Sequence, residues 1–343
     1  MEYTRLGGSG VQVSRICLGM MGMGDPAWRP WILDEGAARP VFRSAVELGV
    51  NFIDTADTYS AGASERLAGK FVREFARRDE MIVMSKVYNP VSLEFKSGQD
   101  PASWAAPRRP NTQGLSRKRI FEAIDATLER LGFEYLDVYQ IHRWDYATPV
   151  EEFMEALHDV VKSGRVRYIG ASSMWAWQFA KAQHVAEQNG WTRFVSMQNH
   201  YNLAYREEER EMLPLLRDTG VACVPWSPLA RGFLARDEAS GTGDARWEGD
   251  KLRRQYYSGD SDRAVAGELA AVARERGVTR AQAAIAWLLS PDSAGGGVTA
   301  PIAGPGSAAE LEELVAATSL RLSPEDVKRL EAPYRPKAVL GHS

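Results

Sequence analysis

The stretch Asn51-Phe-Ile-Asp-Thr-Ala-Asp-Thr-Tyr59 decides the fold class of this chain, because it places a carboxylate and a phenol just past a short apolar strand. Phe52 and Ile53 are typical of a buried strand, and Asp54 marks its carboxyl end. Parallel α/β barrels carry their active sites at the carboxyl ends of the strands. The stretch therefore predicts a barrel strand followed by a loop that holds Asp54 and Tyr59 at the functional face.

Two later apolar strands end in polar residues at the same level of the predicted barrel. The run Met81-Ile-Val-Met-Ser-Lys86 ends in a lysine, and the run Tyr135-Leu-Asp-Val-Tyr-Gln-Ile-His142 ends in a histidine. Taken singly, a strand-end lysine is commonly a solvated charge, and a single histidine is usually structural. Taken together with the first stretch, they predict that four polar side chains converge from three consecutive strand ends.

Tyr59 needs a neighbouring cation to act as a proton donor at neutral pH, because a phenol titrates near pH ~10. Lys86 is the candidate cation. We expect it to lower the pKa of Tyr59, while Asp54 keeps the lysine charged. The alternative for Asp54 is a structural cap.

This arrangement resembles the aldo-keto reductases, which carry an Asp-(x)4-Tyr pair, a strand-end Lys and a His that closes a Gln-x-His strand. All four residues of that pattern are present, as Asp54, Tyr59, Lys86 and His142. The resemblance covers essentially the whole chain. Within the family, the sequence is most similar to the aryl-alcohol-dehydrogenase-type subgroup, which includes versiconal-type reductases. It implies hydride transfer from a nicotinamide cofactor to an aromatic or hydrophobic aldehyde or ketone. Tyr59 would be the general acid, and His142 would also bind the carbonyl oxygen.

Length and composition fit one soluble enzyme domain. The chain has 343 residues, of which 44% are hydrophobic and 25% charged, and its net charge is −3. This balance gives no electrostatic basis for binding nucleic acid or a membrane, and no apolar run reaches the roughly 18 residues of a membrane helix. Cys17 and Cys223 lie in apolar runs and are expected to be buried, reduced thiols. We expect a cytoplasmic protein whose partner is a small-molecule carbonyl substrate, with no oligomeric state indicated.

Alternating strand and helix patterns predict a single (β/α)8 barrel rather than a doubly wound sheet, and no GxGxxG follows the first strand. One domain is expected over residues 1–343, with an N-terminal hairpin at 1–13, the barrel at about 15–322 and a C-terminal tail at 323–343. The expected strands are 15–19, 51–54, 81–85, 135–141, 166–172, 194–198, 221–226 and 298–302. Helical spacing of apolar residues marks 37–48, 119–131, 149–162, 175–189, 207–218 and 263–276.

Two long irregular stretches, residues 89–116 and 234–261, are expected to form lids or substrate loops. The first is locally basic, with Arg108-Arg109 and the run from Arg117 to Arg119. These charges are interpreted as a solvated surface, with contact to an anionic substrate as the alternative. Four aromatic residues of the two loops either reach over the mouth of the barrel or pack on its rim: Trp104, Trp247, Tyr256 and Tyr257.

The same resemblance implies which residues at the later strand ends bind the nicotinamide. Ser172 and Ser173 stand where the family often has Ser-Asn, and Ser172 and Gln198 would hydrogen-bond the carboxamide. Trp226 would stack on the nicotinamide ring, an arrangement worth about 0.5 to 1.5 kcal/mol beyond area burial. The alternative for Trp226 is a core tryptophan.

A second group is implied to bind the pyrophosphate and the ribose. Ser227, Leu229 and Arg231 belong to a loop that can offer backbone N–H groups and a guanidinium to the pyrophosphate, for which arginine is well suited. Met21 would lie near the ribose. The alternatives are a surface turn for the loop and apolar packing for the methionine.

The adenosine end is where the chain departs from the family pattern. Gly304, Gly306, Glu310 and Glu313 lie where relatives hold the 2′-phosphate, at the start of a helix whose N-terminus suits an anion. Residues 304–314 contain no Arg or Lys, although the family commonly has one there. The family implies NADPH as the cofactor, with Ser307, backbone donors or basic residues of another loop on the phosphate. NADH remains the alternative.

Two other functions stay open at this stage, both by resemblance. The first is a redox-sensing regulatory barrel of the channel β-subunit type, which keeps the same four residues. The second is a phosphosugar enzyme of isoprenoid precursor synthesis, which would need basic residues at the pocket. No metal is expected, because the five histidines and two cysteines show no metal-ligand spacing.

Overall fold

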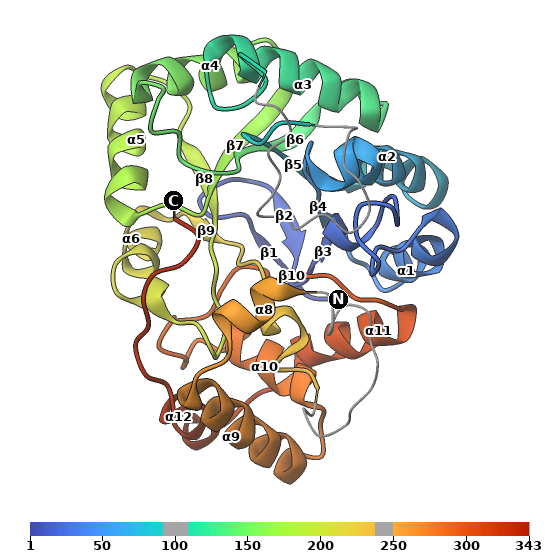
Figure 1. The fold of residues 1–343 in the computed structure, drawn as a ribbon, viewed down its shortest axis with the longest axis vertical. Coiled ribbons are helices and arrows are strands. Elements are labelled where there is room, and N and C mark those ends of the chain that lie inside the picture. Colours follow the sequence, from blue (N-terminus) through green and yellow to red (C-terminus); the bar gives the residue numbers. More distant parts are fainter. Residues whose placement is uncertain (92–108, 237–249, 343) are drawn as a thin grey trace.

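The computed structural model describes residues 1–91, 109–236 and 250–342, and it places eight parallel strands inside a ring of helices (Figure 1). The strands are β3 (Cys17–Gly19), β4 (Phe52–Asp54), β5 (Ile82–Val87), β6 (Leu136–Ile141), β7 (Val166–Ser172), β8 (Phe194–Gln198), β9 (Ala222–Cys223) and β10 (Ile302–Ala303). They pair in the order β10-β3-β4-β5-β6-β7-β8-β9. The two ends of this order are joined by a hydrogen bond from Ile302 N to Pro225 O at 2.9 Å. The predicted (β/α)8 barrel is confirmed.

Helices cover the outside of the barrel (Figure 1). α3 begins after Ser116, whose hydroxyl accepts a hydrogen bond from Arg119 N, and ends at Gly132, whose left-handed φ of 67° suits glycine. The helices are α1 (Glu35–Glu47), α2 (Ala63–Phe75), α3 (Arg117–Leu131), α4 (Val150–Lys162), α5 (Ala176–Gln188), α6 (Met212–Thr219), α8 (Lys251–Tyr256), α9 (Asp260–Arg276), α10 (Arg280–Leu289), α11 (Ala308–Ala316) and α12 (Pro324–Glu331).

An N-terminal hairpin covers the end of the barrel opposite the strand carboxyl ends. β1 (Tyr3–Arg5) and β2 (Gln12–Ser14) pair antiparallel. Leu6, between them, is fully buried in an apolar cluster with the inward side chains of the barrel strands. Gly8 N donates a hydrogen bond to Gly220 O, just before β9, at 2.7 Å. This packing leaves the carboxyl ends of the strands as the face that can hold a site.

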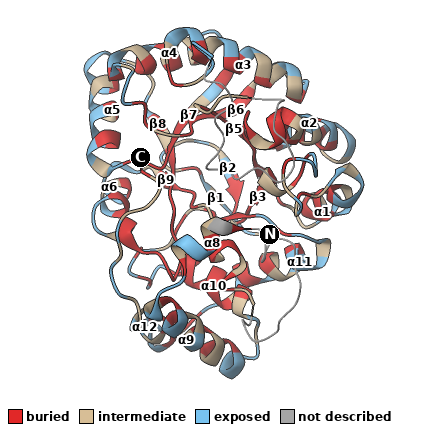
Figure 2. Cartoon of the chain, in the orientation of Figure 1, coloured by how far each residue is buried: buried red, intermediate tan, exposed pale blue. Residues whose placement is uncertain are grey.

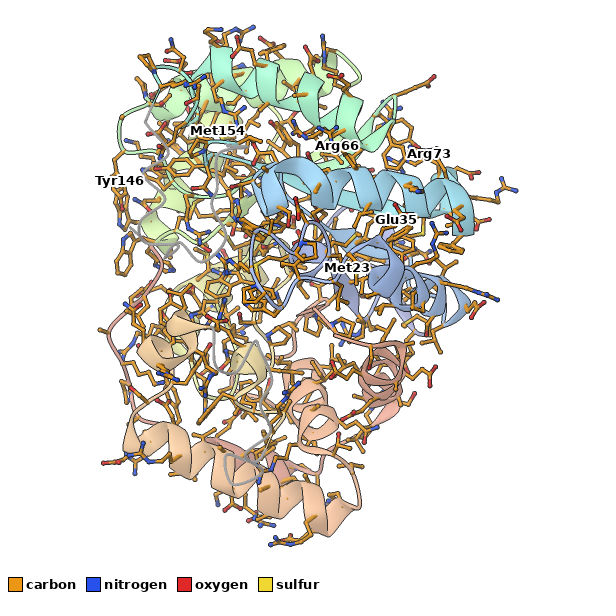
Figure 3. All side chains as sticks on the ribbon, turned by 45° about the vertical axis from the view of Figure 1, so that its right-hand side comes forward. Met23, Glu35, Arg66, Arg73, Tyr146 and Met154 are labelled. Carbon is orange, nitrogen blue, oxygen red and sulfur yellow. The ribbon has the colours of Figure 1, made fainter. Side chains whose placement is uncertain are left out.

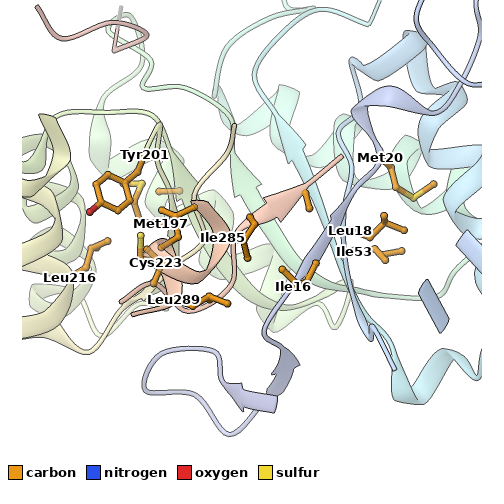
Figure 4. Close-up of a cluster of buried hydrophobic side chains, with 14 of the residues drawn as sticks. Ile16, Leu18, Met20, Ile53, Met197, Tyr201, Leu216, Cys223, Ile285 and Leu289 are labelled. Atoms are coloured by element: carbon orange, nitrogen blue, oxygen red, sulfur yellow. The ribbon is translucent and has the colours of Figure 1, made fainter. Parts of the chain in front are cut away.

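The core lies between the strands and the inner faces of the helices, where Figure 2 shows the buried residues. Met197, Tyr201, Leu216 and Cys223 form part of this cluster between β8, β9 and α6 (Figure 4). Cys223, like Cys17, is buried and free, as expected. Burial raises the pKa of both thiols, so they stay protonated.

The outer surface of the helices is charged. Figure 3 shows Glu35 and Arg73 on the outer side of α1 and α2. Glu35 pairs with Arg39 at 2.8 Å and with Lys70 at 2.6 Å, which links the two helices. Because these side chains are solvated, such pairs contribute little stability. Among the described residues, no helix combines the length and apolarity needed to span a membrane.

Several boundaries differ from the sequence-based expectation. Residues 207–218 were expected as one helix, but only α6 is α-helical, because Pro214 fits the first turn of a helix and not its interior. β9 has two residues instead of 221–226, since Pro225 has no N–H for the ladder. The stretch 234–261 includes α8, and residues 323–343 include α12, which begins with a capping box at Ser323 and Asp326. α2 and α10 were not expected.

Candidate active site

A cavity of about 450 Å³ opens at the carboxyl ends of the strands. Most of the predicted site residues line it: Met21, Asp54, Tyr59, His142, Ser172, Gln198, Trp226, Ser227, Leu229, Arg231, Gly304, Glu310 and Glu313. Lys86 and Ser173 are buried behind the wall and Gly306 is exposed beside it, and each bonds to a lining residue. Residues that the sequence separates by up to 292 positions, from Met21 to Glu313, thus meet at one cavity.

Lys86 is the centre of a buried polar group beneath the cavity. Its ammonium lies 2.6 Å from Asp54 Oδ2, 2.8 Å from Thr55 O and 3.2 Å from Tyr59 Oη. The side chain of Lys86 is fully buried. Burial alone would lower the pKa of Lys86, but Asp54 and Tyr59 raise it, so the lysine is charged. The predicted contact of these three residues is therefore present in the fold.

Two glutamines hold the second oxygen of Asp54. Gln198 Nε2 donates to Asp54 Oδ1 at 2.9 Å, and Gln140 Nε2 donates to the same atom at 3.3 Å. Gln198 was expected to contact the cofactor carboxamide, and its amide nitrogen is instead committed to Asp54. Its oxygen Oε1 accepts no hydrogen bond from the described residues and remains available at the cavity. Gln140 was not predicted as a site residue, although it stands two positions before His142.

The predicted effect of Lys86 on the pKa of Tyr59 is only partly correct. Lys86 does lower the pKa of Tyr59, but burial raises it by more, so the net pKa lies above the ordinary value for tyrosine. Tyr59 is therefore a protonated phenol at neutral pH. The sequence could not show this, because the loop after β4 buries the ring only in the folded barrel.

His142 is neutral and has one hydrogen-bonded ring nitrogen. Burial, with the nearby charges of Arg143 and Lys86, holds the pKa of His142 well below its usual range. The amide nitrogen of Asn89 lies 3.4 Å from His142 Nδ1. Because an amide nitrogen only donates, Nδ1 must accept, which places the proton on Nε2. The ring stands edge-on to Tyr59, with centroids 5.8 Å apart. Asn89 was not predicted as a site residue.

Trp226 has one ring face covered by protein. Its indole stacks on His200 at 4.1 Å and 10°, and His200 stacks in turn on Tyr205 at 3.9 Å and 12°. The indole N–H donates to Ser173 Oγ at 3.0 Å. Trp226 also borders the cavity, so its remaining face is available to a flat ligand. His200 was missed because nothing in the sequence places it behind this tryptophan.

The loops around the cavity carry strained backbone. Of the seven non-glycine residues with positive φ in the described ranges, six belong to the loops after β4, β7 and β9: Ser60, Ala61, Ser173, Ser227, Ala230 and Arg231. Such conformations cost about 1 to 3 kcal/mol each and cluster at functional sites. The observation supports a built ligand site rather than the surface turn considered for residues 227–232.

Arg231 is already held in a buried ion pair, which the sequence did not predict. Its Nε donates to Asp250 Oδ2 at 2.6 Å, and both side chains are buried. Nη2 of Arg231 is buried without a partner among the described residues. The guanidinium therefore keeps one unused donor beside the cavity.

At the adenosine end, the helix N-terminus is already occupied by a side chain of the protein. Glu310 Oε2 accepts from Gly306 N at 2.7 Å, and Ser307 Oγ accepts from Glu310 N at 3.2 Å. Arg236, which also borders the cavity, lies 3.8 Å from Glu310. Arg236 is thus a basic residue of another loop at this end of the cavity, and the sequence did not identify it.

In the described part of the chain, the three basic side chains at 117–119 are each paired with a carboxylate and bring no free charge to the cavity. Arg117 pairs with Asp159, Lys118 with Glu122, and Arg119 with buried Asp57. Tyr256 borders the cavity, whereas Tyr257 is buried and stacks on Phe233 at 5.8 Å. Residues Trp104, Arg108 and Trp247 lie outside the described ranges.

The barrel and its cavity define a class of enzymes that work at the carboxyl ends of parallel strands, and comparison with known proteins names the family. The Aldo/keto reductase family model matches residues 15–335. Versiconal hemiacetal acetate reductase of Aspergillus parasiticus is 44% identical over 99% of this chain and 98% of its own length. The aldo-keto reductase dtxS3 of Metarhizium robertsii is 43% identical over 100% and 94%. A Schizosaccharomyces pombe protein provisionally named an aryl-alcohol dehydrogenase is 42% identical over 99% and 97%.

The chain belongs to the aldo/keto reductase family. It is an oxidoreductase that reduces a carbonyl compound with NAD(P)H, as the named reductases among its relatives also indicate. The two other functions left open by the sequence, a channel subunit and a phosphosugar enzyme, are not favoured by these relatives.

Proposed function

We propose that this protein reduces aromatic or hydrophobic aldehydes or ketones with NADPH, with Tyr59 as the proton donor. The observation that carries the proposal is the contact of Lys86 with both Asp54 and Tyr59 at the wall of a cavity that His142 also lines. The cavity wall supports an aromatic substrate, since Trp28 and Tyr256 border it and the ring of Trp28 lies 6.3 Å from that of Tyr59.

Each polar residue has a distinct part in the proposed mechanism. A bound nicotinamide supplies the hydride. Tyr59 Oη gives its proton to the developing alkoxide, and Lys86 stabilises the phenolate that remains. His142 Nε2 donates a hydrogen bond to the same oxygen, because Asn89 holds the proton off Nδ1. Two preorganised donors on one oxygen supply the electrostatic stabilisation that usually dominates catalysis.

The structure fits a nicotinamide cofactor along the cavity. Trp226 offers its uncovered ring face to the nicotinamide, and Gln198 Oε1 can accept from the carboxamide. The strained loop at Ser227 and Arg231 offers backbone donors and the unused Nη2 of the guanidinium to the pyrophosphate.

Preference for NADPH depends on two opposed charges. Arg236 can turn from Glu310 to a 2′-phosphate, since their separation of 3.8 Å is a loose pair. Glu310 repels the same phosphate and can accept from a free 2′-hydroxyl. We therefore propose that NADPH is preferred, but only modestly.

The test is a cofactor-oxidation screen with aromatic aldehydes, ketones and sugars, each with NADPH and NADH. Tyr59→Phe should lower the turnover of every accepted carbonyl by at least the roughly 10²-fold expected of a positioned acid, with cofactor affinity unchanged. The matched control is Tyr146→Phe, because Tyr146 is 64% exposed. Near-normal turnover in Tyr59→Phe would overturn the proposal.

A further inference from the structure

Arg143 is a cavity residue without a carboxylate partner in the described part of the chain. It follows His142 directly, borders the cavity and is half-buried. Its Nη1 donates to His142 O at 2.7 Å, which fixes one side of the guanidinium. Nε and Nη2 make no hydrogen bond with the described residues, yet neither is sealed inside the protein. These two N–H groups form the edge with which arginine binds a carboxylate in two parallel hydrogen bonds.

Three other arginines of the barrel each hold a carboxylate side chain at ion-pair distance, in contrast to Arg143. Taking a charge out of water is costly unless a partner compensates it. The pairs are Arg119 with Asp57 at 2.7 Å, Arg130 with Glu65 at 2.5 Å and Arg231 with Asp250 at 2.6 Å. Within the described ranges, Arg143 has no carboxylate at ion-pair distance.

The groups that face Arg143 do not supply a negative charge. They are the phenols of Tyr59, Tyr88 and Tyr256, and burial lowers the pKa of the guanidinium by more than these phenols raise it. Asp54, at the same end of the cavity, is already bonded to Lys86. The substrate end of the cavity therefore carries a positive charge that the described residues leave uncompensated.

We propose that the substrate carries a carboxylate close to its reactive carbonyl, and that Arg143 binds this carboxylate through Nε and Nη2. Arg143 is then the residue that determines substrate specificity, and the substrate class is an aromatic or hydrophobic oxo acid. This inference rests on the proposed carbonyl reduction. The guanidinium edge matches a carboxylate and a phosphate ester alike, but the one positive charge of Arg143 balances a singly charged carboxylate and not a phosphate monoester, which carries about −1.5 to −2 at neutral pH.

The experiment compares matched acids and esters. Substrate use is measured as kcat/KM for the three isomers of formylbenzoate, with the carboxylate ortho, meta or para to the aldehyde, and for the corresponding methyl esters, at saturating NADPH. Variants are Arg143→Gln, which removes the charge, and Arg143→Lys, which keeps the charge but loses the paired donors. Arg66→Gln is the control, because Arg66 is an exposed arginine of α2 (Figure 3). Affinity for NADP⁺ is titrated in each variant by protein fluorescence.

We expect the wild type to prefer at least one acid over its ester by roughly tenfold to a hundredfold, the range for charge-assisted hydrogen bonds. Arg143→Gln should lose this preference because kcat/KM falls for the acid and stays the same for the ester. Arg143→Lys should keep part of the preference. The affinity for NADP⁺ should not change in either variant. Equal use of acids and esters by the wild type would overturn the inference while leaving carbonyl reduction intact. Weaker binding of NADP⁺ to Arg143→Gln, with no change in the acid-to-ester ratio, would overturn it too and make Arg143 a cofactor contact.

A separate binding measurement distinguishes failure of this inference from failure of the proposed function. If no carbonyl is reduced, carbonyl reduction by this site is refuted. Calorimetry of meta-(hydroxymethyl)benzoate with the NADP⁺ complex then still tests the anion site. Binding that is lost in Arg143→Gln supports the site, and binding that is absent from the wild type overturns it.

Discussion

The imidazole of His200 lies flat against the indole of Trp226, with centroids 4.1 Å apart and 10° between the planes. Tyr205 closes the far side of His200, and Tyr257 Oη bonds His200 Nε2 at 2.5 Å. Trp226 therefore cannot turn toward the protein interior without disrupting this stack. Its free face is held at a fixed place on the cavity wall.

Trp226→Ala should weaken cofactor binding. Loss of ring stacking costs about 0.5 to 1.5 kcal/mol beyond the lost area, and each 1.4 kcal/mol is tenfold in affinity. Calorimetric titration with NADP⁺ is expected to show a dissociation constant raised by about tenfold. Trp177→Ala, at a tryptophan that is 60% exposed, is the control. An unchanged constant in a folded Trp226→Ala protein would make Trp226 a packing residue only.

Lys86→Met should lower kcat by about 10² or more, because the phenolate of Tyr59 loses its cation. The single variant also leaves Asp54 buried without its counter-charge, and breaking a buried pair costs about 3 to 5 kcal/mol. The double variant Asp54→Asn/Lys86→Met removes both charges and should recover stability but not turnover. Circular dichroism and steady-state rates separate the two effects. Recovery of turnover in the double variant would contradict the role of Lys86.

Asn89→Asp tests how His142 is held. An aspartate accepts where the amide donated, so the proton of neutral His142 moves to Nδ1 and the pKa of His142 rises. Only protonated His142 then donates from Nε2, and turnover should be kept at low pH and fall as pH rises through the new pKa. The measurement is kcat from about pH 5 to 9, the range in which histidines titrate. A flat profile that matches the wild type would show that Asn89 does not set the tautomer.

Cofactor choice should respond to three substitutions, one that lowers the preference for NADPH and two that raise it. Arg236→Gln should reduce the ratio of kcat/KM for NADPH over NADH by about tenfold, because one charge-assisted contact to the phosphate is worth roughly 1.5 to 3 kcal/mol. Glu310→Gln should increase the ratio by removing a like charge. Gly306→Arg should also increase it, since a Cβ at Gly306 meets no atom closer than 3.4 Å. A ratio that none of the three changes would place the phosphate elsewhere.

Asp57 should make folding stability depend on pH. Burial outweighs the charge of Arg119 and raises the pKa of Asp57 from 3.8 to about 7. The folded state therefore binds this proton more tightly than the unfolded chain, so the stabilisation is present below about pH 4 and is lost as pH rises to about 7. At about 1.4 kcal/mol per pKa unit, the loss is at most about 4 kcal/mol.

Urea unfolding of wild type and Asp57→Asn between about pH 4 and 8 measures this effect. The difference in free energy of unfolding between the two proteins should shrink or reverse as pH rises through the window. Asp218→Asn, at an exposed position, provides the control. A constant difference across the window would mean that Asp57 stays ionised in the folded protein.

The order of the eight strands, the barrel and the strand-end positions of Asp54, Lys86 and His142 were predicted from the sequence, and the structure brings these side chains together around Tyr59 as expected. Such features are local, since the period of apolar residues identifies strands and helices, and in a parallel barrel every strand ends on the same face. Most of the site residues predicted from the sequence also line the cavity.

Tertiary structure alone decided which partners these residues meet and how deeply they are buried. Asn89 reaches His142 from 53 positions away, and Gln198 reaches Asp54 from 144 positions away. Burial reversed the expected change in the pKa of Tyr59, and only the fold shows that Arg143 has no carboxylate partner in the described residues. The physical reason is that hydrogen bonds and desolvation depend on distances and water access between segments remote in sequence, which no local pattern of residues records.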